Sequence, residues 1–193
     1  IDNFKENITC SFLLSEFNTI LREDDDLRHK LEVYEQATNI DSEESLVDLK
    51  KDYTLTLLRY WLFIMKLRDI CNTNFTTILY FFSEDCRECP MQGFYLSYYK
   101  RKEKDKIMVF AIQSDIGLPI VDSLVLNFNI TTFPTIIINE KDKYVGLRDK
   151  DSLLNILCSH DFSLSFCNGT IVNKTISLPD KYISCLLYTS PSP

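Results

Sequence analysis

The sequence predicts an α/β domain that follows a helical hairpin, and two observations indicate this order. Between residues 9 and 71, apolar side chains recur at three-to-four spacing with no glycine or proline among them, which is typical of amphipathic helices. From residue 76 onward, short continuous apolar runs alternate with helical patterns, which is typical of buried strands joined by helices. We therefore expect two units, with the boundary where the pattern changes.

The first unit, residues 1–72, is expected to be an antiparallel hairpin of helices at 9–39 and 43–71. The stretch NIDSEE interrupts the apolar pattern, and Asp41 or Ser42 can cap the second helix. An alternative is that the apolar stripes form the seam of a coiled-coil dimer. In the hairpin, Cys10 and Cys71 stand nearly equal distances from the turn at Asp41, so the two arms end together. This placement predicts a structural disulfide between Cys10 and Cys71, the alternative being two separate buried thiols.

The second unit, residues 73–158, is expected to contain seven elements around a mixed sheet. Their order is strand 76–83, helix 87–102, strand 106–113, helix 118–130, strand 135–139, strand 143–147 and helix 149–158. The sequence thus predicts a β-α-β-α-β-β-α domain. Residues 159–193 show no assignable fold and are expected to form an irregular C-terminal tail.

Composition limits the possible partners and compartment. The 193-residue chain has a net charge of -7, which argues against nucleic acid or anionic lipid as a partner. Seven cysteines favour an oxidising, extracytoplasmic setting. The N-x-S/T glycosylation sequons favour the same setting, and they start at Asn7, Asn74, Asn129, Asn168 and Asn173. Because the chain begins with Ile1, we expect that an upstream signal or membrane anchor has been removed.

The stretch FFSEDCRECPMQ holds the candidate functional pair, Cys86 and Cys89. A buried strand leads to Cys86, and a helix is expected to begin at about the two cysteines. Free N–H groups and the helix dipole favour negative charge at a helix start, so a thiolate there becomes a usable nucleophile. One alternative is a permanently oxidised structural disulfide. The other is zinc, but His29 and His160 are the only histidines and no second CxxC exists.

Four segments of the sequence resemble the thioredoxin superfamily. They are ILYFFSEDCRECP, IMVFAIQSD, FNITTFPTIIIN and KYVGL, and they fall within about residues 75–158. The resemblance implies a thioredoxin-like domain in which Pro134 follows a cis peptide bond and lies beside the CxxC pair. It also implies that Gly146 matches the glycine of the family's last strand.

The chain departs from the family pattern near the cysteines. Asp85, Arg87 and Glu88 occupy the variable positions around the pair. Tyr80 stands six residues before Cys86, where thioredoxins have a buried aspartate that carries protons, and the bulky Phe133 precedes the proline. These departures argue against fast reductase turnover and leave oxidase, isomerase and slow reductase roles open.

The resulting hypothesis is an exported protein thiol–disulfide oxidoreductase with a redox-active centre at Cys86 and Cys89. Thr132, Phe133 and Pro134 are the expected substrate-binding residues, protein thiols and disulfides are the partners, and no metal or organic cofactor is required. The alternative is a non-catalytic cell-surface binding or scaffold module on a disulfide-stapled thioredoxin-like fold. The reduction potential of the CxxC pair distinguishes the two. Among the remaining cysteines, Cys158–Cys167 is the preferred pairing, which leaves Cys185.

Overall fold

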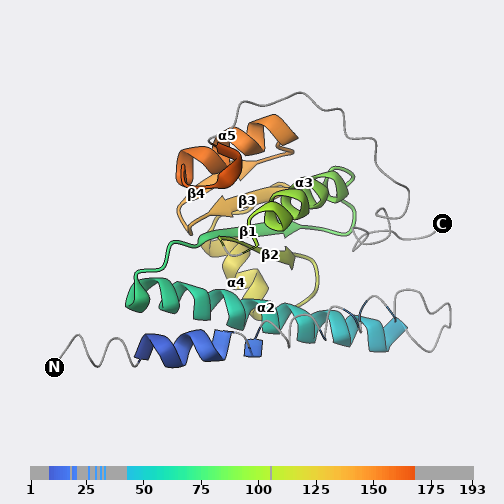
Figure 1. Ribbon diagram of the computed structural model, residues 1–193. Coiled ribbons are helices and arrows are strands. Elements are labelled where there is room, and N and C mark those ends of the chain that lie inside the picture. The colour runs from blue at the N-terminus through green and yellow to red at the C-terminus, as the bar shows by residue number, and fades with distance from the viewer. Residues whose placement is uncertain are drawn as a thin grey trace. The chain divides into compact units, whose positions relative to one another are not determined.

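The computed structural model describes residues 9–17, 19–20, 26, 29, 31, 33, 43–104 and 106–167. The chain divides into two compact units, residues 1–75 and 76–193, which are described separately below. Figure 1 labels their elements.

The first unit contains a helical segment at residues 9–17 and the long helix α2 (Glu43–Cys71), whose bounds are those predicted from the sequence. Cys10 and Cys71 form a disulfide with their Cα atoms 5.5 Å apart, and the rings of Phe17 and Tyr60 lie 5.8 Å apart. Cys10 thus contacts the last residue of α2, and Phe17, further along the first segment, contacts an earlier residue of α2. The two helices are therefore antiparallel. Most of the remainder of the predicted first helix lies outside the described residues.

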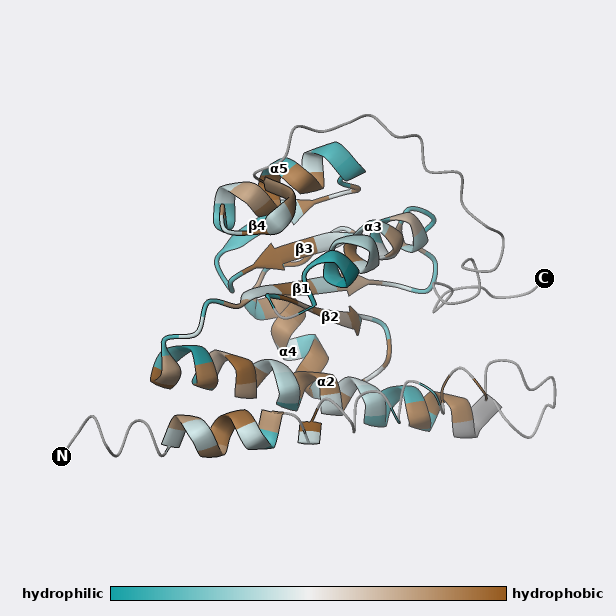
Figure 2. Cartoon of the chain, viewed as in Figure 1, coloured by the Kyte–Doolittle hydropathy of each residue, from teal (hydrophilic) through white to brown (hydrophobic). Residues whose placement is uncertain are grey.

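The buried face of α2 repeats at three-to-four spacing, as an amphipathic helix requires. Its buried apolar residues are Leu57, Leu58, Tyr60, Trp61, Ile64 and Leu67. Apolar and polar residues alternate along this helix in Figure 2. Trp61 is the only tryptophan of the chain and is 7% exposed, so its fluorescence reports on the packing around α2.

The second unit is built on a four-stranded mixed sheet with the order β2-β1-β3-β4. Its strands are β1 (Thr76–Phe82), β2 (Ile107–Gln113), β3 (Thr135–Ile138) and β4 (Asp142–Val145). β1 pairs with β2 in parallel and with β3 antiparallel, and β3 and β4 form an antiparallel hairpin. Every residue of β1 is buried, which explains why its sequence is continuously apolar instead of alternating.

Helices cover both faces of this sheet (Figure 1). They are α3 (Cys89–Lys102), α4 (Pro119–Asn127) and α5 (Lys150–His160). Ile78 and Tyr80 of β1 face a core shared with α3 and α5. Phe81 points to the opposite face, where its ring lies 6.1 Å from that of Phe128, directly after α4. The order of strands and helices is the predicted β-α-β-α-β-β-α.

The structure differs from the predicted tail over residues 159–167. Helix α5 continues to His160, and a short 3-10 helix, η2 (Ser165–Cys167), follows it. Leu164 is fully buried, the Phe166 ring lies 5.0 Å from that of Tyr99, and a disulfide joins Cys158 to Cys167. These few apolar contacts and one covalent link hold the segment against α3 and α5. The rest of the predicted tail lies outside the described residues.

No helix in the described part of the chain has the length and apolar character needed to cross a bilayer.

Candidate functional site

The cysteine pair lies in the connection between β1 and α3. Cys86 and Cys89 form a disulfide with Cα atoms 5.4 Å apart. Helix α3 begins at Cys89, so Cys86 stands in the turn before it and not within the helix. The backbone N–H of Cys89 donates to the carbonyl of Cys86 at 3.3 Å, which closes this turn. Pro90 follows in the first turn of the helix, where the missing N–H removes no helical hydrogen bond.

The two sulfur-bearing residues differ in exposure. Cys89 is 1% exposed and belongs to the core beneath α3 and α5, whereas Cys86 is half-buried at its edge. A thiol-directed reagent can therefore reach Cys86 more easily than Cys89.

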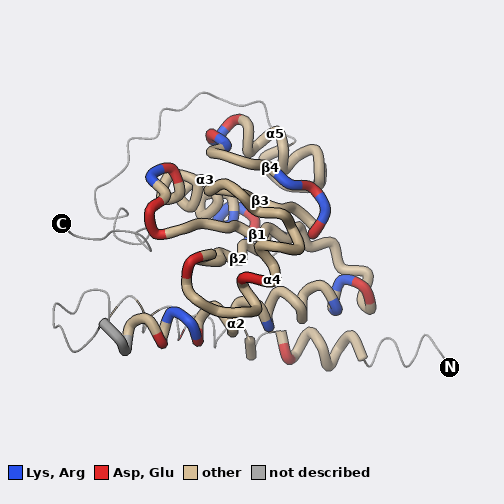
Figure 3. Tube along the Cα trace, turned by 180° about the vertical axis from the view of Figure 1, so that it is seen from behind, with Lys and Arg blue, Asp and Glu red and all other residues tan. Residues whose placement is uncertain are grey.

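The electrostatic surroundings of the pair contain opposing contributions. Glu88 occupies the N-cap of α3 without a side-chain capping bond, and the dipole of the helix favours negative charge at this end. The loop that carries the cysteines is also charged (Figure 3). Glu84, Asp85 and Glu88 are exposed acids there, and Arg87 is an exposed base. The carboxylates disfavour a thiolate on Cys86 while the helix start and the guanidinium favour it, so we expect only moderate activation.

The strand register brings the proline segment to the same end of the sheet as the cysteine pair. Phe81, near the end of β1, pairs with Thr135, the first residue of β3. The chain leaving β1 toward Cys86 and the chain entering β3 from Pro134 therefore lie side by side. The Phe133–Pro134 peptide bond is cis. Thr132 is exposed, Phe133 is half-buried and Pro134 is buried, so the segment presents mainly its first two residues to solvent.

Two hydrogen bonds hold the proline segment in place. The Thr135 hydroxyl donates to the Thr132 carbonyl at 2.6 Å. The Gly146 N–H donates to the Pro134 carbonyl at 2.8 Å, and Gly146 has a φ of 81°. Because side chains rarely adopt that backbone conformation, a glycine at the end of β4 suits this turn.

Tyr80 fills the position where thioredoxins have a buried aspartate. It is 5% exposed, and its hydroxyl donates to the carbonyl of Cys89 at 2.6 Å. Burial raises the pKa of Tyr80, so the phenol stays protonated and acts as a donor. The residue type at position 80 reveals the missing carboxylate but not this contact. The sequence does hold one signal for it. Tyr80 stands two residues after Ile78 in the strand, so the two side chains lie on the same face of the sheet, which α3 covers.

A buried polar residue of α3 also contributes to the site, although it is not among the site residues predicted from the sequence. Gln92 is fully buried, and its Oε1 accepts a hydrogen bond from the backbone N–H of Arg148 at 2.7 Å. This bond links the helix that begins at Cys89 to the loop after β4. A polar side chain three residues after Cys89, one helical turn along the same face, was the only signal for it.

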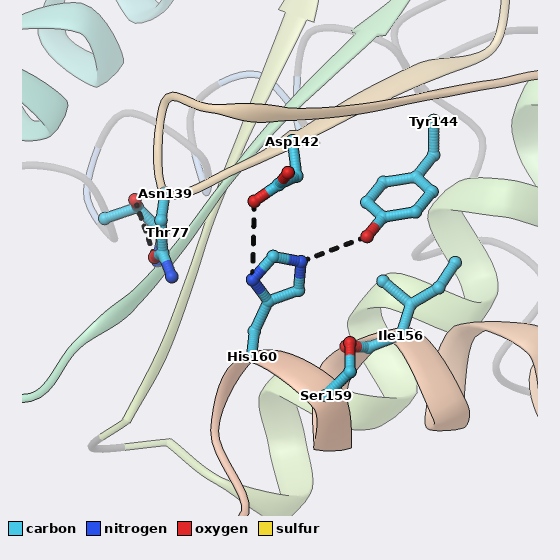
Figure 4. A network of polar contacts seen from close by, with 7 residues as sticks. All are labelled: Thr77, Asn139, Asp142, Tyr144, Ile156, Ser159 and His160. Carbon is cyan, nitrogen blue, oxygen red and sulfur yellow. Dashed lines mark hydrogen bonds and ion pairs between the residues drawn. The ribbon is translucent and has the colours of Figure 1, made fainter.

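His160 is half-buried at the end of α5 (Figure 4). Its Nε2 lies 3.1 Å from the Tyr144 hydroxyl, and its Nδ1 lies 3.8 Å from the carboxylate of Asp142. In the same view, Asn139 accepts a hydrogen bond from the backbone N–H of Thr77 at 3.0 Å. These contacts join α5 to β4 and the β3–β4 turn to β1. In the described ranges, no group of three or more His, Cys, Asp or Glu could hold a metal ion.

The second unit therefore has a thioredoxin-like fold, with a CxxC disulfide before its first helix and a cis proline entering β3. The predicted structural pair, Cys10 and Cys71, forms its own disulfide in the first unit. No protein-family model matches the chain, and no curated protein sequence matches it.

Solved structures similar to this chain include several thioredoxins. Thioredoxin-2, described as a component of the malaria parasite protein secretion machinery, is 23% identical over 46% of this chain and 85% of its own, with a TM-score of 0.40. Chloroplastic thioredoxin z is 20% identical over 51% of this chain and 89% of its own, with a TM-score of 0.41. Deadhead from Drosophila melanogaster is 18% identical over 51% of this chain and 92% of its own, also with a TM-score of 0.41.

Proposed function

We propose that the chain is an exported thiol–disulfide oxidoreductase that exchanges disulfides with protein substrates through Cys86 and Cys89. The observation that carries the proposal is the asymmetry of the pair. A half-buried cysteine precedes a helix start, and a buried partner lies within disulfide distance in the first turn. This arrangement suits an outer attacking sulfur and an inner resolving sulfur.

In the reducing direction, the Cys86 thiolate attacks one sulfur of a substrate disulfide. The substrate disulfide breaks, its second sulfur leaves as a thiolate, and a mixed disulfide joins Cys86 to the first sulfur. Cys89 then loses its proton to solvent and attacks the Cys86 sulfur, which releases the first substrate sulfur as a thiolate and forms Cys86–Cys89. Two electrons pass from the protein dithiol to the substrate, and the released thiolates take protons from solvent. The reverse sequence oxidises a substrate dithiol.

The proline segment supports a role in holding the substrate. Thr132 and Phe133 reach solvent at the end of the sheet where the cysteine pair stands. Thr132 offers backbone groups to an extended substrate chain, and Phe133 offers an apolar surface next to it. Pro134 lacks an N–H and is buried, so its role is to fix the conformation of the segment and not to donate a hydrogen bond to the substrate.

Two features support an oxidising, extracytoplasmic location. Disulfides join Cys10 to Cys71 and Cys158 to Cys167 outside the candidate centre, and such bonds persist mainly in oxidising compartments. Asn74 and Asn129, the acceptor residues of the two sequons within the described ranges, are both exposed. Expression with a secretory signal in a glycosylating host, followed by glycosidase digestion, tests whether these sites are accessible during export.

The reduction potential of Cys86–Cys89 tests the exchange function. The protein is equilibrated in glutathione and dithiothreitol buffers, and differential alkylation with mass spectrometry gives the reduced fraction of each cysteine. A value between about -270 and -120 mV is typical of exchange catalysts and would support turnover. A value below about -300 mV would favour a structural disulfide, and with it a non-catalytic binding module. The other two disulfides serve as internal controls and should stay oxidised where the CxxC pair is reduced.

Trapping experiments test the assigned roles. In Cys89→Ser the mixed disulfide with a substrate cannot be resolved, so covalent complexes should accumulate and disappear on reduction. Cys86→Ser is the matched control, because the remaining cysteine is 1% exposed and should form few complexes. Equal trapping by both variants would show that the roles are assigned wrongly.

A further inference from the structure

Tyr80 is packed tightly beneath the start of α3. Its ring stacks on that of Phe82 with centroids 5.5 Å apart. On the helix side it faces Gly93, and a Cβ atom at that position would lie 3.7 Å from the ring. That spacing is ordinary van der Waals contact, so the ring packs directly against this part of the helix. The ring is therefore held between the sheet and the helix, with its hydroxyl directed at the first residue of α3.

The hydrogen bond from Tyr80 reaches the backbone of the buried cysteine itself. The acceptor is the carbonyl of Cys89, and both groups are buried. A buried hydroxyl without a partner is costly, so the tyrosine and the helix start hold each other in one arrangement. A carbonyl can only accept, so the phenol must be the donor, and this bond persists at any pH at which Tyr80 is protonated.

We propose that Tyr80 is a positioning residue for the thiol pair, holding Cys89 beneath Cys86 through the Cys89 carbonyl and so favouring closure of the Cys86–Cys89 disulfide. The inference rests on the proposed exchange function. Closure requires the Cys89 sulfur to attack the Cys86 sulfur while the bond from Cys86 to the substrate breaks. A fixed Cys89 raises the effective concentration of the attacking group, which speeds this step and stabilises its product.

Tyr80 differs in chemistry from the carboxylate that thioredoxins place here. A protonated phenol can donate to the carbonyl, but it has no free base with which to take the proton of Cys89. In this chain the proton lost by Cys89 therefore passes to water or hydroxide, while the tyrosine contributes position alone. The rate of the resolving step should accordingly rise with pH until Cys89 is fully ionised, with no earlier plateau from an internal base.

The test compares Tyr80→Phe with Tyr99→Phe. Tyr99 is a matched control because it is 2% exposed and its hydroxyl also donates to a backbone carbonyl, that of Lys150, at 2.9 Å. It stands ten residues beyond Cys89 in α3. Each variant loses one buried hydroxyl and one hydrogen bond, so their losses of global stability should be similar. The readouts are the equilibrium constant of the CxxC pair with glutathione and the rate at which a preformed Cys86–glutathione mixed disulfide is resolved.

In Tyr80→Phe the glutathione equilibrium should shift about two- to tenfold toward the reduced pair, the range expected for the loss of one hydrogen bond. Resolution of the mixed disulfide should slow by a similar factor. Tyr99→Phe should leave both values unchanged. If the two variants match each other in both readouts, Tyr80 has only a structural role and the proposal is overturned.

A second variant covers the case in which Tyr80→Phe does not fold. Gly93→Val keeps the hydroxyl but places branched carbons against the ring, because even a Cβ there lies 4.0 Å from the Tyr80 oxygen. It should shift the equilibrium in the same direction, and an unchanged constant would refute the positioning role. If the wild-type pair does not exchange with glutathione, the proposed function fails instead. The equilibria of the variants can then still be compared by dithiothreitol titration.

Discussion

Removing the Cys10–Cys71 disulfide should destabilise the helical unit strongly. The two cysteines are separated by 61 residues, and closing a loop of that size restricts the unfolded chain by about 4 kcal/mol in the chain-entropy estimate. A unit of this size has a total free energy of unfolding of roughly 4–11 kcal/mol. The double substitution Cys10→Ser/Cys71→Ser is therefore expected to remove a large fraction of that free energy.

Urea unfolding followed by Trp61 fluorescence measures this change. The single tryptophan is buried on α2, so its emission is expected to follow the unfolding of the helical unit. With a slope of roughly 1 kcal/mol per molar urea, the midpoint should fall by several molar or the unit should be partly unfolded without urea.

The Cys158→Ser/Cys167→Ser double variant is the control. That disulfide spans 9 residues and should contribute only about 3 kcal/mol, and it lies in the other unit. Its loss should leave the Trp61 transition in place. A Trp61 midpoint that is the same in the Cys10/Cys71 variant and the wild type would refute the loop-closure reasoning or the pairing itself.

Three further predictions concern the second unit. Gly93→Ala should raise its free energy of unfolding by about 0.5–1 kcal/mol, because alanine is the better helix former and its Cβ makes only ordinary contact with Tyr80. A lower thermal midpoint would show that the ring does not tolerate it. Hydrogen bonds from Ser152 lower the pKa of Asp149, the N-cap of α5, so its stabilisation is present at neutral pH and is lost as the pH falls through that lowered pKa. Asp149→Asn should flatten the acid side of a plot of thermal midpoint against pH, and an unchanged profile would contradict the capping role. Tyr144→Phe should cost about 1 kcal/mol or less by removing the contact with His160, as measured by circular dichroism melting, and no loss would mean that solvent replaces the contact fully.

The sequence predicted the elements of the fold well because their signals are local. β1 is a continuous apolar run, and α2 carries apolar residues at helical spacing without interruption. The Cys10–Cys71 pairing followed from the equal lengths of two arms around one turn. The start of α3 was predicted less accurately. The turn through Arg87 and Glu88 is stabilised by a hydrogen bond from the Cys89 N–H to the Cys86 carbonyl. No pattern of residue types in the sequence predicts this backbone bond.

The surroundings of the candidate site were harder to predict because they depend on which side chains meet across elements. Tyr80 bonds to the helix start because β1 and α3 pack against each other, and Gln92 finds its partner in a loop 56 residues away. Residues 161–167 look like a loop in the sequence, yet Leu164 and Phe166 pack against the core. Propensity and periodicity describe neighbours along the chain, whereas these contacts are set by tertiary packing.

The disulfide of the helical unit also determines how the chain carries mechanical force. A pull applied between the residues before Cys10 and the second unit passes directly from Cys10 to Cys71 through one covalent bond. The hairpin between them bears none of the load. Once the bond is reduced, the same pull acts along the whole hairpin, and the 61-residue separation can extend by about 200 Å. Under load, the first unit is therefore expected to stay short while this disulfide is intact and to lengthen only after its reduction.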